Sequence, residues 1–201
     1  MPHNCDFGFV HIDVCLLPTQ HVGDGKFCKR YLYVAIERWL RSAHSAIRKD
    51  MTARRAVAFL KEASAVLAFR ITDLLTHYDR CFITGAFREA CAALGVQHRM
   101  TTACMPQTYD AAEKFMRPFE QHVLGIPIDS HLDLERMFSD YNQAYNARPQ
   151  GALEGKSPDQ VVRARLAGDS KPTQPSRTPI NSGVRAKAVI AAKKRQYPTT
   201  T

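Results

Sequence analysis

Residues 9–18 have the sequence FVHIDVCLLP, an apolar run rich in β-branched and aromatic side chains. Such a run predicts a buried β-strand. Residues 30–38 (RYLYVAIER) and 40–48 (LRSAHSAIR) predict a second and a third strand, and Gly23-Asp24-Gly25, which lies between the first two, is a turn signal. The sequence therefore predicts a meander of three strands, with Asp13 in the middle of the first.

Helices and strands alternate after the meander. Thr52 is a suitable N-cap for a helix over residues 53–68, in which apolar side chains recur at helical spacing. The next predicted elements are a strand over residues 70–76, a helix from Thr84 to just before Gly95, and a strand over residues 96–100.

Three more helices are predicted toward the C-terminus. They cover residues 109–123, with Pro118 inside, residues 130–146, and residues 158–167, where Ser157 opens a capping box. The order β-β-β-α-β-α-β-α predicts an α/β fold with a mixed sheet and helices on both faces.

Size and composition predict one domain followed by a tail. The chain has 201 residues and 45% hydrophobic residues, enough for a core over residues 1–166. Its apolar runs are shorter than the ~20 residues that cross a bilayer. No signal peptide is visible at the N-terminus, so we expect no membrane association and a cytosolic (cytoplasmic) location. The six cysteines lack zinc-site spacing and are expected to be reduced, buried thiols.

Positive charge is concentrated in the predicted tail, residues 167–201. The net charge is +9, and this segment carries seven Lys or Arg residues and one acid, Asp169, leaving +3 for the rest of the chain. A basic tail is attracted to polyanions such as DNA, but it is equally typical of a solvated, flexible end. Charge alone leaves both interpretations open.

Two acids far apart in the sequence outline a phosphoryl-transfer site. Asp13 lies in the first predicted strand, and Glu113 follows the sequence Pro106-Gln107-Thr108. A two-metal site needs several carboxylates from distant segments to hold ions about 3.5–4 Å apart. A third acid is expected between them, but the segment Leu75-Thr76-His77 ends in a histidine there.

Several blocks, in the right order over residues 7–165, resemble the catalytic domain of integrase-type transposases of bacterial insertion sequences, relatives of retroviral integrase. The blocks are Gly8 to Val14, Tyr31 to Arg38, Leu75-Thr76 with Cys81-Phe82, Phe87 to Arg99, Pro106-Gln107-Thr108 with Glu113-Lys114-Phe115, Tyr141-Asn142, Arg148 to Leu153, and Lys156-Ser157-Pro158. The resemblance implies a ribonuclease H-like fold with a mixed five-stranded sheet. It also implies DNA strand cleavage and joining, with Mg²⁺ or Mn²⁺ bound by an Asp-Asp-Glu triad.

The resemblance assigns roles to individual residues. Asp13 matches the first acid and Glu113 the third, both as metal ligands. Thr76 matches a threonine that precedes the second acid, so His77 occupies the second acid's position, and the family's usual 35 intervening residues separate it from Glu113. Asp79 is the candidate replacement for the second acid and a candidate metal ligand, but only 33 residues lie between it and Glu113.

Departures from the family cluster near the site. They include Tyr109-Asp110, Met116 and Pro118. The family also carries a helix-turn-helix region ahead of the catalytic domain, and this sequence begins at the first strand. These residues therefore leave sequence-specific recognition of element ends open.

Two hypotheses describe the site and three describe the function. In the first hypothesis, His77 replaces the second acid and catalysis is lost or weak. In the second, Asp79 takes the place of the second acid. The loop would then have to absorb a shift of two residues, about 6.6 Å along an extended chain. The chain is then a DNA-integrating nucleotidyltransferase, impaired by His77, or a catalytically silent nucleic-acid-binding or oligomerising relic, or an unselected fragment. The expected partners are DNA and a second copy of the chain.

Overall fold

The computed structural model describes residues 7–17, 20–22, 26–101, 115 and 131–168. Its strands are β1 (Phe9–Leu16), β2 (Gln20–Val22), β3 (Lys26–Cys28), β4 (Tyr31–Glu37), β5 (Ala43–Arg48), β6 (Asp73–Thr76) and β7 (Gln97–Met100). Its helices are α1 (Ala53–Val66), α2 (Gly85–Ala93), α4 (His131–Ala147) and α5 (Pro158–Leu166), with a short 3₁₀ turn, η1 (Gly151–Leu153).

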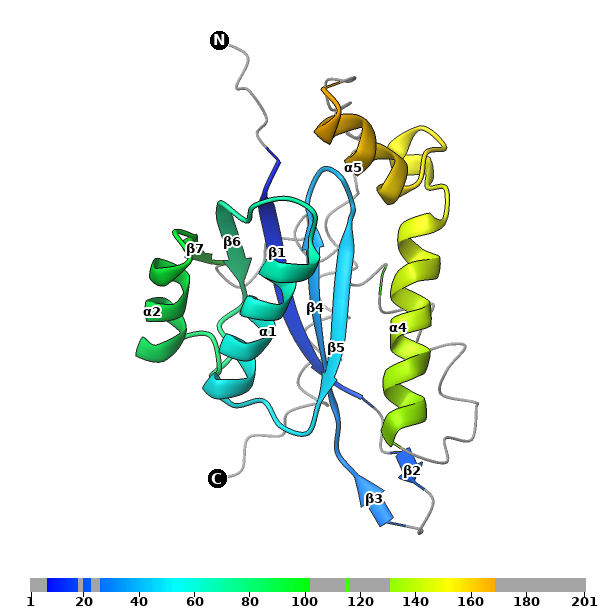
Figure 1. The fold of residues 1–201 in the computed structure, drawn as a ribbon. Coiled ribbons are helices and arrows are strands. Elements are labelled where there is room, and N and C mark those ends of the chain that lie inside the picture. The colour runs from blue at the N-terminus through cyan, green and yellow to red at the C-terminus, as the bar shows by residue number, and fades with distance from the viewer. Residues whose placement is uncertain (1–6, 18–19, 23–25, 102–114, 116–130, 169–201) are drawn as a thin grey trace, which may run out of the picture.

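The main sheet is the mixed five-stranded, ribonuclease H-like sheet that the sequence predicts. Its strand order is β5-β4-β1-β6-β7 (Figure 1). Strands β1, β4 and β5 form the antiparallel meander, while β6 and β7 run parallel to β1. A two-stranded ribbon, β2–β3, stands where the sequence predicts only a turn.

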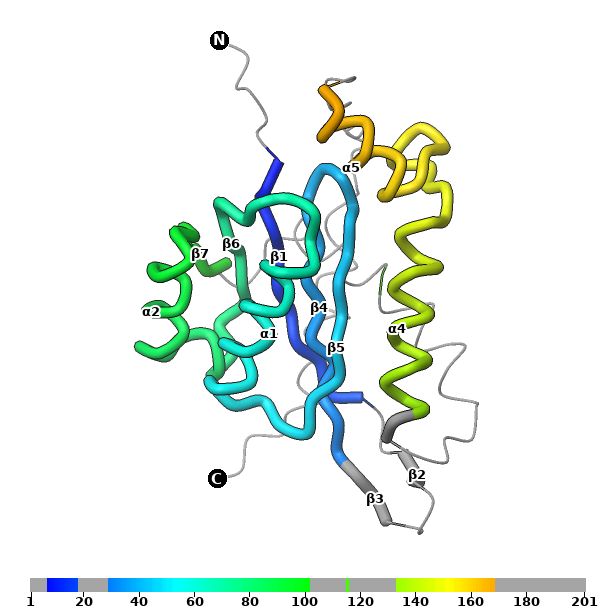
Figure 2. Tube along the Cα trace, viewed as in Figure 1, coloured from blue at the N-terminus to red at the C-terminus, as the bar shows by residue number. Residues whose placement is uncertain are grey.

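Helices cover both faces of the sheet, as expected. On one face, Val10, Ile12 and Val14 of β1 pack in a core cluster with side chains of α1 and α2. On the other face, the cluster contains Cys15, residues of β4 and β5, and side chains of α4. The tube in Figure 2 traces the same arrangement, with α1 and α4 on different sides of β4 and β5. Alternation along each strand therefore divides the core into two layers.

Local signals set the helix starts where the sequence predicts them. The Thr52 side chain accepts a hydrogen bond from the Arg55 N–H, and Thr84 does the same for Phe87. Ser157 forms a full capping box with Gln160, and Pro158 opens α5. These bonds satisfy N–H groups that a helix start leaves without intrahelical partners.

Helix α4 is held against β5 by two asparagines that lie four residues apart. The Asn146 side chain accepts a hydrogen bond from the Ala43 N–H at 2.9 Å and donates one to the Ala43 C=O at 2.7 Å. The Asn142 side chain donates a hydrogen bond to the Ser45 C=O at 2.9 Å and accepts one from the Ser45 hydroxyl at 2.8 Å. Residues at this spacing share one helix face, so both reach the same strand.

A buried carboxylate fixes the turn between β4 and β5. Glu37 is 0% exposed and accepts hydrogen bonds from the N–H groups of Trp39 and Leu40. Its other oxygen accepts a bond from the Gly8 N–H at 3.3 Å. Glu37 thus joins the start of β1 to the turn.

Two predictions lie outside the described residues: the helix over 109–123, apart from residue 115, and the tail beyond residue 168. Cys15, Cys81 and Cys91 are buried free thiols, as expected. Within the described segments, no helix is both long and apolar enough to span a bilayer.

Candidate active site

The first candidate residues meet where β6 ends beside the middle of β1. Ile12 of β1 pairs with Thr76, the last residue of β6, so Asp13 in mid-strand and His77 just after β6 are the next residues of the two neighbouring segments. The His77 Nε2 atom lies 4.0 Å from the Asp13 Oδ2 atom. Both residues are buried, at 5% and 4% exposure. The fold therefore brings the predicted first acid beside the predicted second-acid position.

Asp13 lies on the α4 face of the sheet. Successive strand residues point to opposite faces, and Ile12 and Val14 belong to the core cluster under α1 and α2. Cys15, two residues from Asp13, belongs to the cluster under α4. Asp13 shares this second face.

His11 also belongs to this site, although the sequence reasoning did not select it. It lies two residues before Asp13 on the same strand, and its ring packs edge-on against His77, with centroids 5.1 Å apart. The signal was present, because residues i and i+2 of a strand share a face. Two imidazoles and one carboxylate therefore lie together where β6 ends beside the middle of β1.

Thr101 is the second residue that the sequence reasoning missed. It follows β7, and its N–H donates to the Thr76 C=O at 2.9 Å. Its hydroxyl lies 2.8 Å from the His77 Nδ1 atom. The hydrogen bond orients the imidazole with its Nε2 edge toward Asp13. Nothing in the local sequence distinguishes Thr101 from Thr102, since the contact depends on how β7 pairs with β6.

Asp79 lies in the connection after β6. Its C=O accepts a hydrogen bond from the Phe82 N–H at 2.9 Å. Burial raises the pKa of the Cys81 thiol to about 12, and the negative charges of Asp79 and, more weakly, Asp13 act in the same direction. The Asp79 charge therefore acts on Cys81, a thiol of the core cluster under α1 and α2.

Glu113 lies outside the described residues. Phe115, two positions later in the sequence, is described and is fully buried in the cluster on the α4 face. Its ring packs against those of Tyr141 and Tyr145, with centroids 5.1 and 4.7 Å apart. The Tyr141 hydroxyl donates to its C=O at 2.7 Å. Phe115 therefore occupies the same face of the sheet as Asp13.

The described donors do not fit a pair of Mg²⁺ ions. Mg²⁺ takes oxygen ligands in near-octahedral geometry, whereas His77, which lies beside Asp13 in the described part of the chain, offers an imidazole. No group of three or more His, Cys, Asp or Glu side chains in the described part of the chain is arranged to hold a metal ion. Mn²⁺ accepts nitrogen more readily, but the negative charge of a second carboxylate is still missing at position 77.

No family model matches the chain, and a search of curated proteins gives no significant match either. The functional argument therefore depends on the fold and on the geometry of the site.

Proposed function

We propose that this chain is a transposase/integrase-type domain for DNA strand cleavage and joining, in which His77 impairs catalysis. The observation that supports this proposal is the 4.0 Å approach of His77 Nε2, just after β6, to Asp13 Oδ2, in the middle of β1. These positions correspond to the first two acids of the triad in the family that the sequence resembles. An imidazole now stands where the second carboxylate is expected.

The expected impairment follows from charge and ligand chemistry. Mg²⁺ or Mn²⁺ would supply the charge that stabilises the reacting phosphate oxygens, and Asp13 and Glu113 are the proposed ligands. A neutral histidine adds no negative charge to balance the ions. His77 is also held by Thr101 and is only 5% exposed. Cleavage by the wild-type chain is therefore expected to be weak or lost.

Asp79 is the alternative second acid. It lies two residues after His77, in the connection that follows β6. A shift of two residues along the chain, about 6.6 Å if extended, would have to be absorbed by the connection after β6.

A second candidate function is a catalytically silent nucleic-acid-binding or oligomerising relic. The observation that favours it is the burial of the acid and imidazoles: His11, Asp13 and His77 are each at most 6% exposed. DNA would then be held by charge alone, chiefly by the basic tail.

A nicking and strand-transfer assay separates these functions. Supercoiled plasmid and short duplex DNA are incubated, with Mg²⁺ or Mn²⁺, with the wild type, His77→Asp, Asp79→Asn, and the double variant Asp13→Asn/His77→Asp. We expect His77→Asp to cleave at least about tenfold faster than the wild type, equivalent to about 1.4 kcal/mol in the barrier. Cleavage by the double variant should fall to the background rate.

The other outcomes are equally informative. Wild-type cleavage that Asp79→Asn abolishes would establish Asp79 as the second acid. If His77→Asp is folded, as judged by circular dichroism, and neither it nor the wild type cleaves, the enzymatic proposal is wrong and the silent relic is favoured.

A further inference from the structure

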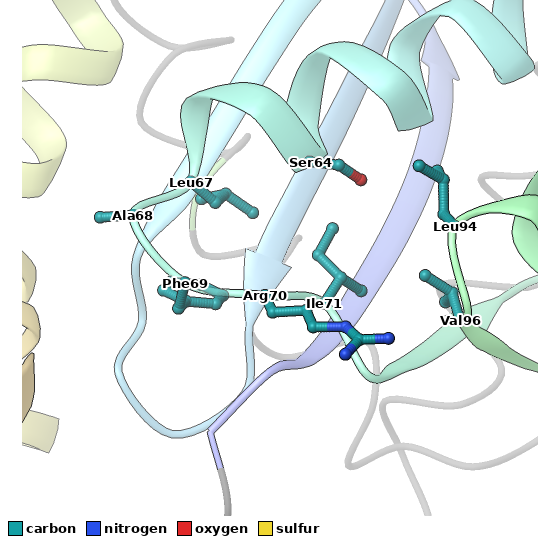
Figure 3. Close-up of a pocket in the computed structure, with 8 residues that line it drawn as sticks. All are labelled: Ser64, Leu67, Ala68, Phe69, Arg70, Ile71, Leu94 and Val96. Carbon is teal, nitrogen blue, oxygen red and sulfur yellow. The ribbon is translucent and has the colours of Figure 1, made fainter.

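A groove lies at the C-terminal end of α1, away from the candidate active site. Its volume is about 450 Å³, within the range of small-ligand pockets. The lining residues are Ser64, Leu67, Ala68, Phe69, Arg70, Ile71, Leu94 and Val96 (Figure 3). Because the lining residues 67–71 and 94–96 lead into the amino ends of β6 and β7, the groove lies at the opposite end of these strands from His77.

The groove has an apolar floor. Leu67, Ile71 and Val96 line it with 8%, 3% and 7% of their surfaces exposed. Filling the groove would remove apolar surface from water, which is favourable by roughly 25 cal/mol per Å².

Arg70 places a positive charge in this apolar setting. Figure 3 shows its side chain running from the α1–β6 connection toward Val96. Its guanidinium lies against Gly95, where an added Cβ would be only 2.7 Å from one guanidinium nitrogen. Arg70 makes no ion pair or side-chain hydrogen bond with any described residue. A carboxylate can therefore bind it in a bidentate manner without displacing any described residue.

The backbone beside the groove is also available. Residues 68–71 form no backbone hydrogen bond within the part of the chain that the structure describes. The Arg70 C=O lies against Gly8, just before β1; the other N–H and C=O groups of this stretch have no bond to a described residue, so a ligand could pair with them. An extended peptide satisfies such groups by pairing alongside them.

We propose that this groove binds an extended segment of a partner protein in which an apolar side chain is followed by Asp or Glu. The apolar side chain would enter the floor formed by Leu67, Ile71 and Val96, and the carboxylate would pair with Arg70. Backbone groups of residues 68–71 would hold the segment in register. The proposal does not depend on the DNA chemistry proposed for Asp13 and His77.

Other occupants fit the groove less well. The tail of this chain is basic, with seven Lys or Arg residues, and would bring positive charge to Arg70. A fatty acid could use Arg70 and the apolar floor, but it would leave the hydrogen-bonding groups of residues 68–71 unused. A peptide is the occupant that uses all three features.

Fluorescence anisotropy with the full chain tests the proposal. The probe is a labelled peptide pool, Gly-Ser-X-X-Asp-Glu-Gly-Ser, in which X is Leu, Ile, Val, Met or Phe; the control pool carries Asn-Gln in place of Asp-Glu. We expect the acidic pool to bind at least about tenfold more tightly than the amide pool. Arg70→Glu should weaken binding of the acidic pool at least about tenfold, while Arg70→Lys should retain part of it.

Arg54→Glu is the matched control variant. Arg54 is exposed at the other end of α1, and its substitution changes the charge by the same amount. It should leave peptide binding unchanged, and circular dichroism should show that both charge variants are folded. The proposal is overturned if the acidic pool fails to bind below about 1 mM, binds no better than the amide pool, is weakened equally by Arg54→Glu and Arg70→Glu, or is displaced by decanoate at equal concentration.

Discussion

At the scale of single residues, Glu37 links ionisation to stability. Burial raises the pKa of its carboxyl above the usual 4.5, although the hydrogen bonds from the N–H groups of Leu40, Trp39 and Gly8 oppose the shift. The folded protein therefore holds this proton more tightly than the unfolded chain does. The stabilising contribution is fully present below about pH 4.5 and is lost as the pH rises through the folded-state pKa.

The substitution Glu37→Gln tests this linkage. Because the amide does not titrate, the unfolding free energy of the wild type should fall relative to that of Glu37→Gln as the pH rises from about 4 to about 8. Urea denaturation at several pH values measures the difference. Glu89→Gln, at an exposed position, is the control. The difference between its unfolding free energy and that of the wild type should stay constant within about 0.5 kcal/mol over this pH range. A wild type that gains stability relative to Glu37→Gln over this range would contradict the prediction.

Gly8 is a position where only glycine fits. Its φ is +117°, and an added Cβ would lie 2.5 Å from the Arg70 C=O oxygen. Gly8→Ala should therefore destabilise the fold by about 1–3 kcal/mol, as measured by thermal or urea unfolding. Gly85→Ala is the control, since the nearest atom to its Cβ would be 3.9 Å away at the start of α2. Gly85→Ala should leave stability unchanged or raise it slightly. Equal losses of stability for the two variants would show that the backbone of Gly8 has no special need for glycine.

At the scale of elements, the contact of α4 with β5 depends on asparagine side chains. Asn146→Ala leaves both the N–H and the C=O of Ala43 without their side-chain partner. We expect a loss of about 1–3 kcal/mol in unfolding free energy, measured in urea. Gln143→Ala, at an exposed position of the same helix, should change stability by less than about 0.5 kcal/mol. Similar losses for both variants would mean that the bonds to Ala43 add little.

Most element positions could be predicted because their signals are local. Thr52, Thr84 and Ser157 begin helices through hydrogen bonds that span three residues, and alternation or apolar runs identify the longer strands. The ribbon β2–β3 was missed because each of its strands has three residues, too few for a period to show. The predicted start of β6, residue 70, was three residues early, since the apolar residues Phe69 and Ile71 line a groove instead of forming a strand.

The site could be predicted only where strand position alone determines it. Asp13 lies in the middle of β1 and His77 directly after β6, the two positions that the resemblance assigned to them. The Thr101 contact with His77 depends on the pairing of β7 with β6, which no local pattern encodes. The convergence of Glu113 with Asp13 stays a prediction.

At the scale of the whole molecule, charge is distributed unevenly. Residues 168–201 carry seven Lys or Arg residues and one acid. If they hold DNA, deleting them should lower affinity at least about tenfold near 0.15 M salt. The plot of log K against log salt should also become less steep, by about 0.9 for each phosphate that the tail had neutralised. Anisotropy titrations of labelled duplex DNA measure both quantities.

A scrambled tail of the same composition is the control, and it should bind as the wild type does, because phosphate contacts do not read sequence. Binding that is indifferent to salt and to the deletion would rule out the tail as the segment that holds DNA.

The two outer strands of the sheet differ in a way that limits how copies can associate. Among the described residues, the outward backbone of β5 is occupied by Asn142 and Asn146, whereas β7 pairs only with β6. In polymer terms the described part of the sheet is monofunctional: its β7 edge could accept another strand, but the asparagines block addition at β5. Association through strand addition would therefore end at discrete pairs and would not continue into fibrils.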